Sequence, residues 1–374
     1  MEPQRLFVLS VALLGMACGG TAADVKTSRP TEPMDPAPSV LRGPPIVYGL
    51  PNLDNLGADW NAEDPDDDEI VRFEVVPSME TPAALELELS GSASTRIWWD
   101  GGIVARPNDR TFEMPGTSDP IALGVEFKDF DSDAILTVRE LDSEGAVTAS
   151  VDITLRASPL LLNHHLQPAE FVVATTVSYY GITNDALVEG YEEALGDRFE
   201  AANGNRYFQD PWMQDEIEFG YGITPYGDVL DIVVDSIRDR GLDDYPEDVW
   251  AGESFGVKTW GRGYASSQDS FGNLEVTPPV EGYPFGRIYY GASGGFLDPQ
   301  ATKLFEMFEE NRLQAPFEVD ISWLCVGHVD EFMTFIGLCS LPSARPSVGG
   351  RCGRRRGPVN AVRALRRLHI TPPL

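Results

Sequence analysis

Apolar and polar residues alternate along much of the chain between Ile46 and Ala157. The clearest case is residues 84–89, where Ala-Leu-Glu-Leu-Glu-Leu follows the two-residue period of a half-buried strand. Further strand patterns, separated by Gly, Pro, Asn and Asp, are Ile70–Val76, Arg96–Trp99, Ile121–Phe127, Ile135–Leu141 and Val151–Leu155. About six or seven short strands with turn signals predict a β-sandwich of immunoglobulin-like size over residues 46–157.

The pattern changes after Pro159 to a mixture of strands and helices. Thr183–Leu195 has helical spacing, with Thr183 or Asn184 as its cap and Gly196 at its end. A second helical pattern begins at Asp298. The strand patterns of this region are Leu160–Leu162, Phe171–Thr176, Val229–Val234 and Val319–Leu324. Strands and helices in succession predict an α/β domain over residues 158–335, so the whole chain is expected to have an α+β fold.

The first 45 residues predict an exported protein with a linker. Leu6–Ala17 is an uncharged apolar run, too short for a membrane helix and typical of a secretory signal. We expect residues 1–23 to be a signal peptide, either of lipoprotein type with the lipid on Cys18 or cleaved after Ala23. Residues 24–45 hold six prolines and predict an extended linker. The expected location is the cell envelope or the extracellular space; the alternative is a cytoplasmic chain.

Charge is strongly unbalanced along the chain. There are 28 Lys and Arg against 59 Asp and Glu, a net charge of −31. This balance excludes nucleic acid as the main partner, because a protein that binds the phosphate backbone is basic. Glu331 is the last acidic residue, and residues 336–374 hold eight arginines. We expect this segment to be an aberrant basic tail, read out of frame after about Phe335; a genuine basic tail is the alternative.

Two acidic clusters lie between the predicted strands of the sandwich. Residues 54–69 contain eight Asp and Glu and no base, and residues 129–133 place three Asp at alternate positions after Glu126. Calcium takes about six to eight oxygen ligands from flexible loops. The sequence therefore predicts calcium sites in these loops, and a solvated acidic loop is the alternative. The spacing does not match the helix–loop–helix calcium motif.

A run of carboxylates and aromatics lies at Trp212–Tyr221 in the second region. In strand geometry, Gln214, Glu216 and Glu218 share one face and Asp215 points to the other. That arrangement would place three oxygen ligands on a metal and one carboxylate in a separate space. A solvated strand face is the alternative.

Another such segment is Trp323–Phe332, in which His328 and Asp330 would share one strand face. A histidine beside a carboxylate suits acid–base work on a cationic group, and a buried core histidine is the alternative. Earlier in the chain, the consecutive residues His164 and His165 could bind a metal, but no third ligand lies at a useful spacing, so we expect a structural or surface pair.

Five motifs together resemble the catalytic domain of the protein-arginine deiminases. In the family's order, they read QDEIEFGY, DSIRDRG, FGNLEVTPPV, YPFGRI and VGHVDEF. The resemblance runs from about Leu160 to Phe335, and the preceding sandwich resembles the family's middle domain. It implies that residues 158–335 are part of a five-bladed α/β propeller, of which about the first half is present.

The resemblance also implies a site and a reaction. Asp215 and Asp330 would each accept a fork of hydrogen bonds from a substrate guanidinium, and His328 would be general acid and then base. The other substrate-binding residues would be Trp212, Arg238 and Arg240. Calcium would be held by Gln214, Glu216, Glu218, Asp235, Ser236, Asp239, Glu275 and the carbonyls of Phe271 and Leu274. Asp239 stands where the family pattern has Asn, which keeps an oxygen ligand and adds charge.

The family's nucleophile is a cysteine well beyond the HxD motif, and no segment here matches that region. Cys325 lies on the opposite strand parity to His328 and is expected to face away from the site. Cys339 and Cys352 lie in the basic tail, and Cys18 lies in the signal. We therefore expect a calcium-dependent enzyme that converts arginine in peptides or proteins to citrulline and ammonia, inactive as encoded. The rival hypothesis is a non-catalytic, calcium-binding envelope lipoprotein, which would touch a membrane only through a lipid on Cys18.

Overall fold

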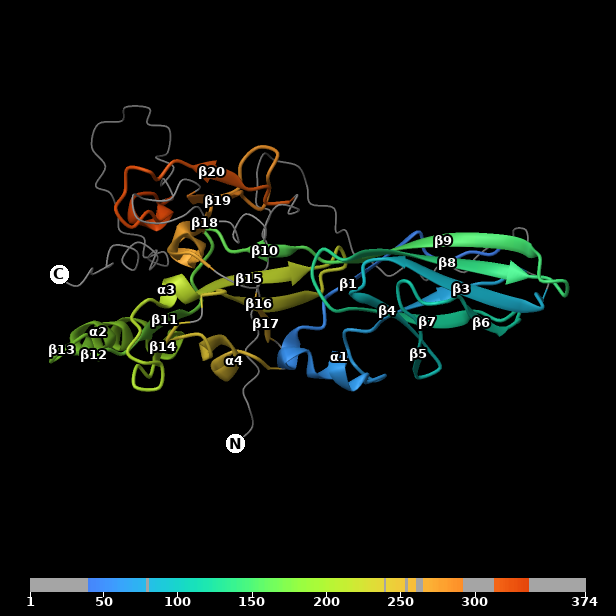
Figure 1. Cartoon of the computed structure of the whole chain (residues 1–374), viewed down its shortest axis with the longest axis horizontal. Coiled ribbons are helices and arrows are strands. Elements are labelled where there is room, and N and C mark those ends of the chain that lie inside the picture. Colours follow the sequence, from blue (N-terminus) through green and yellow to red (C-terminus); the bar gives the residue numbers. More distant parts are fainter. Residues whose placement is uncertain are drawn as a thin grey trace, which may run out of the picture. The chain divides into compact units, whose positions relative to one another are not determined.

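The computed structural model of the chain describes residues 40–78, 81–238, 240–252, 255–259, 265–291 and 313–335. Its first region contains two β-sheets, with strand orders β1-β9-β8-β3-β6 and β2-β7-β4-β5 (Figure 1). The strands are β1 Ile46–Gly49, β2 Val71–Val75, β3 Ala84–Gly91, β4 Thr95–Trp99, β5 Gly102–Ala105, β6 Phe112–Pro115, β7 Ile121–Phe127, β8 Asp133–Leu141 and β9 Val147–Ala157. Two short helices, η1 Asp54–Gly57 and α1 Ala58–Ala62, connect β1 to β2.

Strand β3 shows how the alternation buries one face of a sheet. Its three leucines are at most 4% exposed. Its glutamates lie on the other face, where Glu86 and Glu88 accept hydrogen bonds from Arg139 at 2.7 and 2.5 Å. Both sheets contribute to one apolar core that includes Leu85, Leu123, Phe127, Leu136 and Ile153. Burying each such side chain contributes about 1.5–3 kcal/mol, and the predicted β-sandwich is confirmed.

Three strands of the sandwich were not predicted from the pattern. Strands β1, β5 and β6 are four residues long, and each contains Gly or Pro. So short a segment shows at most two periods of alternation. Their pairing is therefore decided by the neighbouring strand, as where β1 runs parallel to β9.

The second region is built from small sheets and short helices. Its strands are β10 Leu160–Leu162, β11 Val172–Thr175, β12 Ser178–Tyr179, β13 Ile182–Thr183, β14 Phe199–Ala202, β15 Ile217–Ile223, β16 Val229–Asp235, β17 Phe255–Thr259, β18 Leu274–Val276, β19 Ile288–Gly291 and β20 Phe317–Val319. Its helices are α2 Asp185–Leu195, η2 Gly196–Arg198, α3 Met213–Glu216, α4 Tyr245–Val249, η3 Ser267–Asp269, η4 Phe271–Asn273 and η5 Val329–Glu331.

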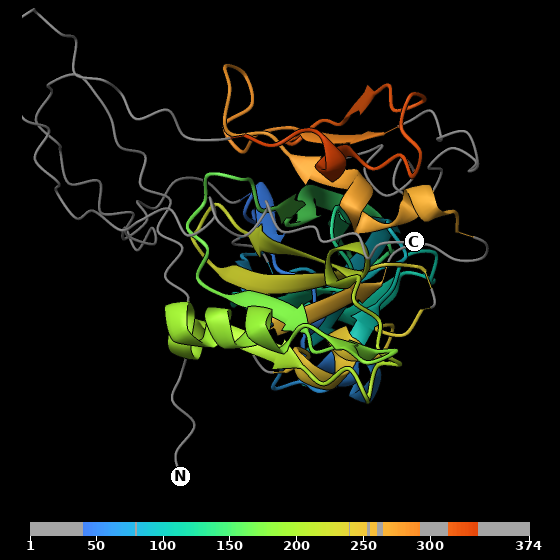
Figure 2. The same ribbon diagram turned by 90° about the vertical axis from the view of Figure 1, so that its left-hand side faces the viewer.

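Two of these sheets pack against each other and position the candidate site. One has the order β10-β15-β16-β17, and the other, coloured orange to red in Figure 2, has the order β18-β19-β20. Leu162, Ile232 and Val234 of the first sheet share an apolar cluster with Val276 and Ile288 of the second. The described chain is thus mostly β, with few helices, and none of its helices is both long and apolar enough to cross a membrane.

Helix α2 confirms most of the helical pattern predicted for residues 183–195, although Thr183 belongs to strand β13. The helix begins at Asp185, directly after Asn184, and ends at Leu195, directly before Gly196. The Asn184 side chain does not cap it. Instead, its Oδ1 accepts from the backbone N–H of Val177, and its Nδ2 donates to the carbonyl of Thr175. Asn184 therefore ties the helix to the end of β11.

Two predicted strands are wrong. Residues 213–216 form one turn of helix, α3, and the strand begins only at Ile217. Near the end of the described chain, β20 stops at Val319, and His328 precedes the 3-10 turn η5 instead of lying on a strand. Segments this short depend on tertiary contacts more than on local periodicity. The predicted helix from Asp298 lies outside the described residues.

Candidate functional site

Three predicted catalytic side chains meet around Gly272. A Cβ at this position would lie 2.7 Å from Asp215 Oδ1, 2.8 Å from His328 Nδ1 and 3.2 Å from Asp330 Oδ2. Asp215 comes from α3, Gly272 from η4 and Asp330 from η5, and His328 directly precedes η5. The structure therefore brings the three residues together, although not on the strand faces that the sequence predicted.

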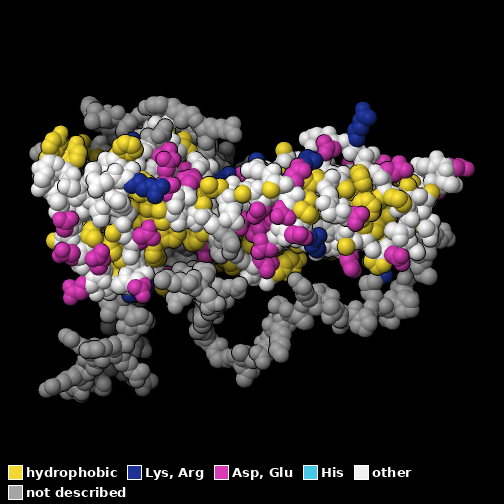
Figure 3. All heavy atoms as spheres, turned by 90° about the horizontal axis from the view of Figure 1, so that it is seen from below, with side chains coloured by type: hydrophobic (Ala, Val, Ile, Leu, Met, Phe, Trp, Pro, Cys, Tyr) yellow, Lys and Arg dark blue, Asp and Glu magenta, His cyan; other side chains and the backbone are white. Residues whose placement is uncertain are grey.

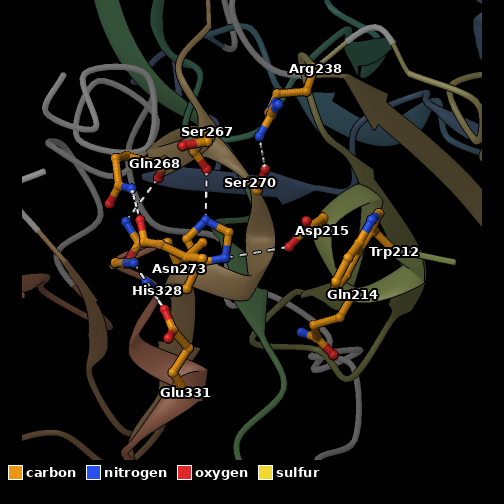
Figure 4. Close-up of polar contacts among 12 residues, drawn as sticks. Trp212, Gln214, Asp215, Arg238, Ser267, Gln268, Ser270, Asn273, His328 and Glu331 are labelled. Carbon is orange, nitrogen blue, oxygen red and sulfur yellow. Dashed lines mark hydrogen bonds and ion pairs between the residues drawn. The ribbon is translucent and has the colours of Figure 1, made fainter. Parts of the chain in front are cut away.

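His328 is held in one orientation by the backbone around it. Its Nε2 donates to the carbonyl of Ser267 at 2.8 Å, because a carbonyl can only accept (Figure 4). Its Nδ1 lies 3.5 Å from Asp215 Oδ1. Glu331 Oε1 accepts from the backbone N–H groups of Gly327 and His328 at 2.9 and 2.8 Å, which fixes the turn. The ring nitrogen that faces the site is therefore Nδ1.

Opposing charges act on the Asp215 carboxyl. Burial raises the pKa of Asp215, and the nearby Asp330 raises it further, whereas His328 and Arg240 lower it. Arg240 Nη1 lies 3.3 Å from Asp215 Oδ2. A buried carboxyl with a raised pKa and a second carboxyl beside it gains stability from a cation. A planar guanidinium fits that requirement.

Arg240 is oriented by Asp210, a residue that the sequence analysis missed. Asp210 accepts from Arg240 Nη2 at 3.1 Å and from Arg240 Nε at 3.2 Å. It also accepts from the backbone N–H of Trp212 at 3.0 Å, two residues on, which is the turn expected of an Asp before Pro. That local turn was the available signal. In Figure 4, Asp215 points toward His328, and Arg238 donates to Ser270 Oγ at 2.8 Å.

The predicted calcium ligands fall partly into a first group around α3. Gln214 Nε2 donates to Glu218 Oε2 at 3.1 Å, so these two side chains are adjacent. Phe271 and Leu274 are buried neighbours, since the Leu274 N–H donates to the Phe271 carbonyl. Glu275, which adjoins Leu274 in the chain, places its Oε2 against His165 Nε2.

The contact of His165 with Glu275 was not indicated by the sequence. The side chain of His165 is fully buried, and its Nδ1 accepts from the backbone N–H of Phe335 at 2.8 Å. Its ring also lies edge-on to Tyr289. His165 thus has a structural role. Its ring also contacts Glu275, which is a predicted metal ligand.

A second group contains Glu216, Asp235 and Asp243, with one carboxylate oxygen of each within 4.8 Å of the others. Burial, Asp235 and Asp243 raise the pKa of Glu216 to about 9. Burial raises the pKa of Asp235 to about 8, although the Thr259 hydroxyl lowers it. Ser236 is buried beside them, its N–H donating to the Glu216 carbonyl at 2.8 Å. The predicted ligand Asp239 lies outside the described residues.

The acidic segment of residues 54–69 forms a third group in the sandwich. Asp67, Asp68 and Glu69 each place one oxygen within 4.8 Å of the others, and acidic side chains gather around α1 (Figure 3). Burial raises the pKa of Glu69 to about 9. Asn52 Nδ2 donates to Asp67 and to Glu126, so Glu126 belongs near this group.

The other predicted acidic loop, residues 129–133, is largely used in ion pairs. Asp129 lies 2.6 Å from Lys258 Nζ, and Asp133 accepts from Arg156 at 2.9 and 3.0 Å. These contacts neutralise two of its three carboxylates without a metal. The calcium prediction is therefore better supported at residues 54–69 than here.

The carboxylate oxygens of Glu216 and Asp235 are ligands that suit a hard cation such as calcium. The raised pKa values of these two residues also predict how pH affects the stability of the fold. Ordinary values for Glu216 and Asp235 are 4.5 and 3.8, and the folded values are about 9 and about 8. Without calcium, their protonated forms stabilise the fold fully below about pH 4, and this contribution is lost as the pH rises toward about 9. The melting temperature should fall over that range in chelator, and the rise that calcium causes should grow with pH.

Differential scanning fluorimetry from about pH 5 to about pH 9, with chelator or with calcium, measures this effect. Glu216→Gln should flatten the slope in chelator, because one of the titrating groups is gone. A melting temperature in chelator that rises steadily over the same range would contradict the prediction.

Comparisons with known proteins show the family of this chain. The family model described as protein-arginine deiminase (PAD) matches residues 147–340, more than half of the chain. The chain therefore belongs to the protein-arginine deiminase family, as its motifs predicted.

Individual relatives match over part of their length. The rat protein-arginine deiminase type-4 is 32% identical over 232 residues, which cover 57% of this chain and 34% of the relative. The mouse type-1 protein is 34% identical over 221 residues, which cover 54% of this chain and 32% of the relative. The human type-1 protein is 44% identical over 137 residues, which cover 34% of this chain and 20% of the relative. The chain thus spans about a third or less of the length of these relatives.

Proposed function

We propose that this chain binds the guanidinium group of an arginine in a peptide or protein, and that the site belongs to a calcium-dependent deiminase. The observation that carries the proposal is the convergence of Asp215, His328 and Asp330 around Gly272. Two carboxylates can each accept a pair of hydrogen bonds from one planar guanidinium. A lysine ammonium could not donate a pair of hydrogen bonds to both carboxylates.

In the proposed reaction, a cysteine thiolate attacks the guanidinium carbon between the two carboxylates. His328 Nδ1 gives a proton to the leaving nitrogen, which departs as ammonia. His328 Nδ1 then takes a proton from the water that hydrolyses the thiouronium intermediate. This hydrolysis leaves citrulline and the free thiolate. Trp212 would pack on the arginine stem, and Arg238 and Arg240 would bind carbonyl groups of the substrate backbone.

The thiolate is the part of this site that the described residues do not supply. Cys325 is exposed, and the strand that was expected to turn it away from the site does not exist. A catalytic thiolate is expected in an electropositive pocket beside its base, and an exposed bend is not such a place. We therefore propose that residues 1–374 bind arginine without converting it, and that the family's cysteine belongs to a region without a match in this chain.

Calcium is proposed at the three groups of oxygen ligands. One would use Gln214, Glu218, Glu275 and the carbonyls of Phe271 and Leu274. A second would use Glu216, Asp235, Ser236 and Asp239, and a third the acidic segment of residues 54–69. Asp215 lies between Gln214 and Glu216 on α3, so positive charge on both sides would fix the carboxylate that binds substrate. A five-bladed propeller is the proposed fold of the complete catalytic domain.

Isothermal calorimetry with benzoyl-L-arginine amide tests the proposal. The 374-residue chain should bind it in calcium at least about tenfold more tightly than in chelator, because unneutralised carboxylates repel one another around α3. Benzoyl-L-citrulline amide is the control ligand and should not compete, since it is neutral. Ammonia release should be absent.

Two results would contradict the proposal. Equal affinity for the arginine and citrulline ligands would show that the carboxylate pair does not recognise a guanidinium. Ammonia release that is lost in Cys325→Ala would show that the chain holds its own nucleophile.

Export and a lipid on Cys18 remain predictions, since residues 1–39 lie outside the described residues. The acidic segment of residues 54–69 also suits the rival function, a calcium-binding envelope lipoprotein without catalysis. Arginine binding at the Gly272 site separates the two hypotheses, because a purely calcium-binding module has no need of it.

A further inference from the structure

Asp243 lies beside two of the proposed calcium ligands but is not among the ligands that the family resemblance implies. Glu216 ends α3, Asp235 ends β16, and Asp243 lies in the turn before α4. One carboxylate oxygen from each residue lies within 4.8 Å of the other two. Two oxygens that bind one calcium at about 2.4 Å are at most about 4.8 Å apart. The three carboxylates can therefore share one ion.

The turn that carries Asp243 is fixed by its neighbours. Leu242 and Tyr245 flank it, both are fully buried, and both belong to the apolar cluster beneath β15 and β16. The N–H of Tyr245 donates to the Leu242 carbonyl at 2.8 Å. Asp243 is thus held near Glu216 by packing and does not reach it by chance from a loose loop.

Buried oxygens at this place lack donors. Glu216 is 1% exposed and Asp235 is 3% exposed. Neither Glu216 Oε1 nor Asp235 Oδ1 has a hydrogen-bond partner among the described residues. The other oxygen of Asp235 accepts from Thr259 Oγ1 at 2.7 Å. A buried carboxylate oxygen without a donor is costly, so these atoms indicate a ligand that accepts their lone pairs.

The nearby arginine does not fill that role. Arg240 directs Nε and Nη2 to Asp210 and Nη1 to Asp215. Its guanidinium therefore serves two carboxylates on the guanidinium-binding side of α3. Arg240 thus makes no hydrogen bond to Glu216 Oε1 or Asp235 Oδ1, the two oxygens that lack a donor.

We infer that Asp243 is a further carboxylate ligand of a calcium-type cation held with Glu216 and Asp235. The inference rests on the proposed calcium dependence of the protein. The ion would join the turn before α4 to α3, the helix that carries Asp215, and would therefore couple metal binding to the guanidinium site. The additional negative charge of Asp243 would also tighten the binding of a divalent ion.

Asp243→Asn tests the inference on the full chain, with Asp244→Asn as the matched control because Asp244 is adjacent and exposed. Calcium calorimetry should show one class of site weakened about tenfold in Asp243→Asn and unchanged in Asp244→Asn. The melting temperature in chelator should stay equal or rise, since repulsion with Glu216 and Asp235 is relieved. The rise on adding calcium should shrink.

A purely structural Asp243 would give the opposite result: a lower melting temperature in chelator and an unchanged calcium affinity. Glu216→Gln distinguishes the role of Asp243 from the proposed calcium dependence. If it weakens a calcium site and Asp243→Asn does not, this inference is overturned and the proposed calcium dependence stands. If neither variant changes calcium binding, the proposed site at Glu216 fails as well.

Discussion

Replacing Asp215 by Asn is expected to weaken the binding of benzoyl-L-arginine amide by about 100-fold, which corresponds to about 2.7 kcal/mol. The substitution keeps the shape of the side chain but removes the charge that pairs with a guanidinium. The Asp215 side chain is 13% exposed and its Oδ1 lies 3.5 Å from His328 Nδ1, so little water can replace the lost carboxylate, unlike on an exposed surface.

The same variant should leave the fold intact. Burial raises the pKa of Asp215, so its ionised form is the costly one in the free protein. The melting temperature without ligand should therefore stay within a few degrees of the parent. Asp197→Asn, an exposed aspartate after α2, is the control and should change neither quantity. Parent-like arginine affinity in Asp215→Asn would remove this carboxylate from the proposed site.

The second large effect is expected at Gly272. Its replacement by Ala would place a Cβ 2.7 Å from Asp215 Oδ1 and 2.8 Å from His328 Nδ1. Contacts under 3.0 Å force these side chains to move, and both atoms are side-chain termini that can move. We expect a loss of arginine binding of at least about 100-fold and a cost in stability of about 1–3 kcal/mol.

Gly190→Ala is the matched control. Gly190 lies in helix α2, and a Cβ there would meet nothing within 4 Å. That substitution should raise stability slightly, because Ala favours the helix by about 1 kcal/mol over Gly. Calorimetry and thermal unfolding measure both variants. If Gly272→Ala binds arginine as the parent does, the three side chains do not form the recognition site.

Asp215→Asn and Gly272→Ala change two different properties of the site. Asp215→Asn removes a charge and keeps the space, whereas Gly272→Ala keeps every charge and fills the space. A site that merely attracts cations would lose affinity in the first and retain it in the second. A site shaped for guanidinium should lose affinity in both.

Much of the first region was determined by the sequence itself. The alternation at residues 84–89 places leucines on one face and glutamates on the other, and β3 buries the leucines accordingly. Helix α2 was also readable, from its apolar spacing and from Gly196 at its end. These segments are long enough to show several periods, so local pattern and tertiary packing agree.

Shorter segments could not be read in this way. Residues 213–216 fit a strand by alternation, yet they form a helical turn that ends where β15 begins. Four residues fit either periodicity, and contacts with other elements decide between them. The residue types at Asp215, His328 and Asp330 came from the sequence through a family resemblance, but their positions on helical turns did not.

Only the tertiary structure decided which charged groups meet. Asp243 joins Glu216 and Asp235, Asp210 holds Arg240, and His165 reaches Glu275. Local spacing does not encode these groupings, because each includes residues that lie far apart in the chain, such as Glu216 and Asp243, and that the packing of buried apolar faces brings together. The sequence alone determined the sandwich, the acidic character and the motifs of the family. The arrangement of those motifs around Gly272 depends on long-range packing, since a shared side-chain space exists only once the separate turns have packed together.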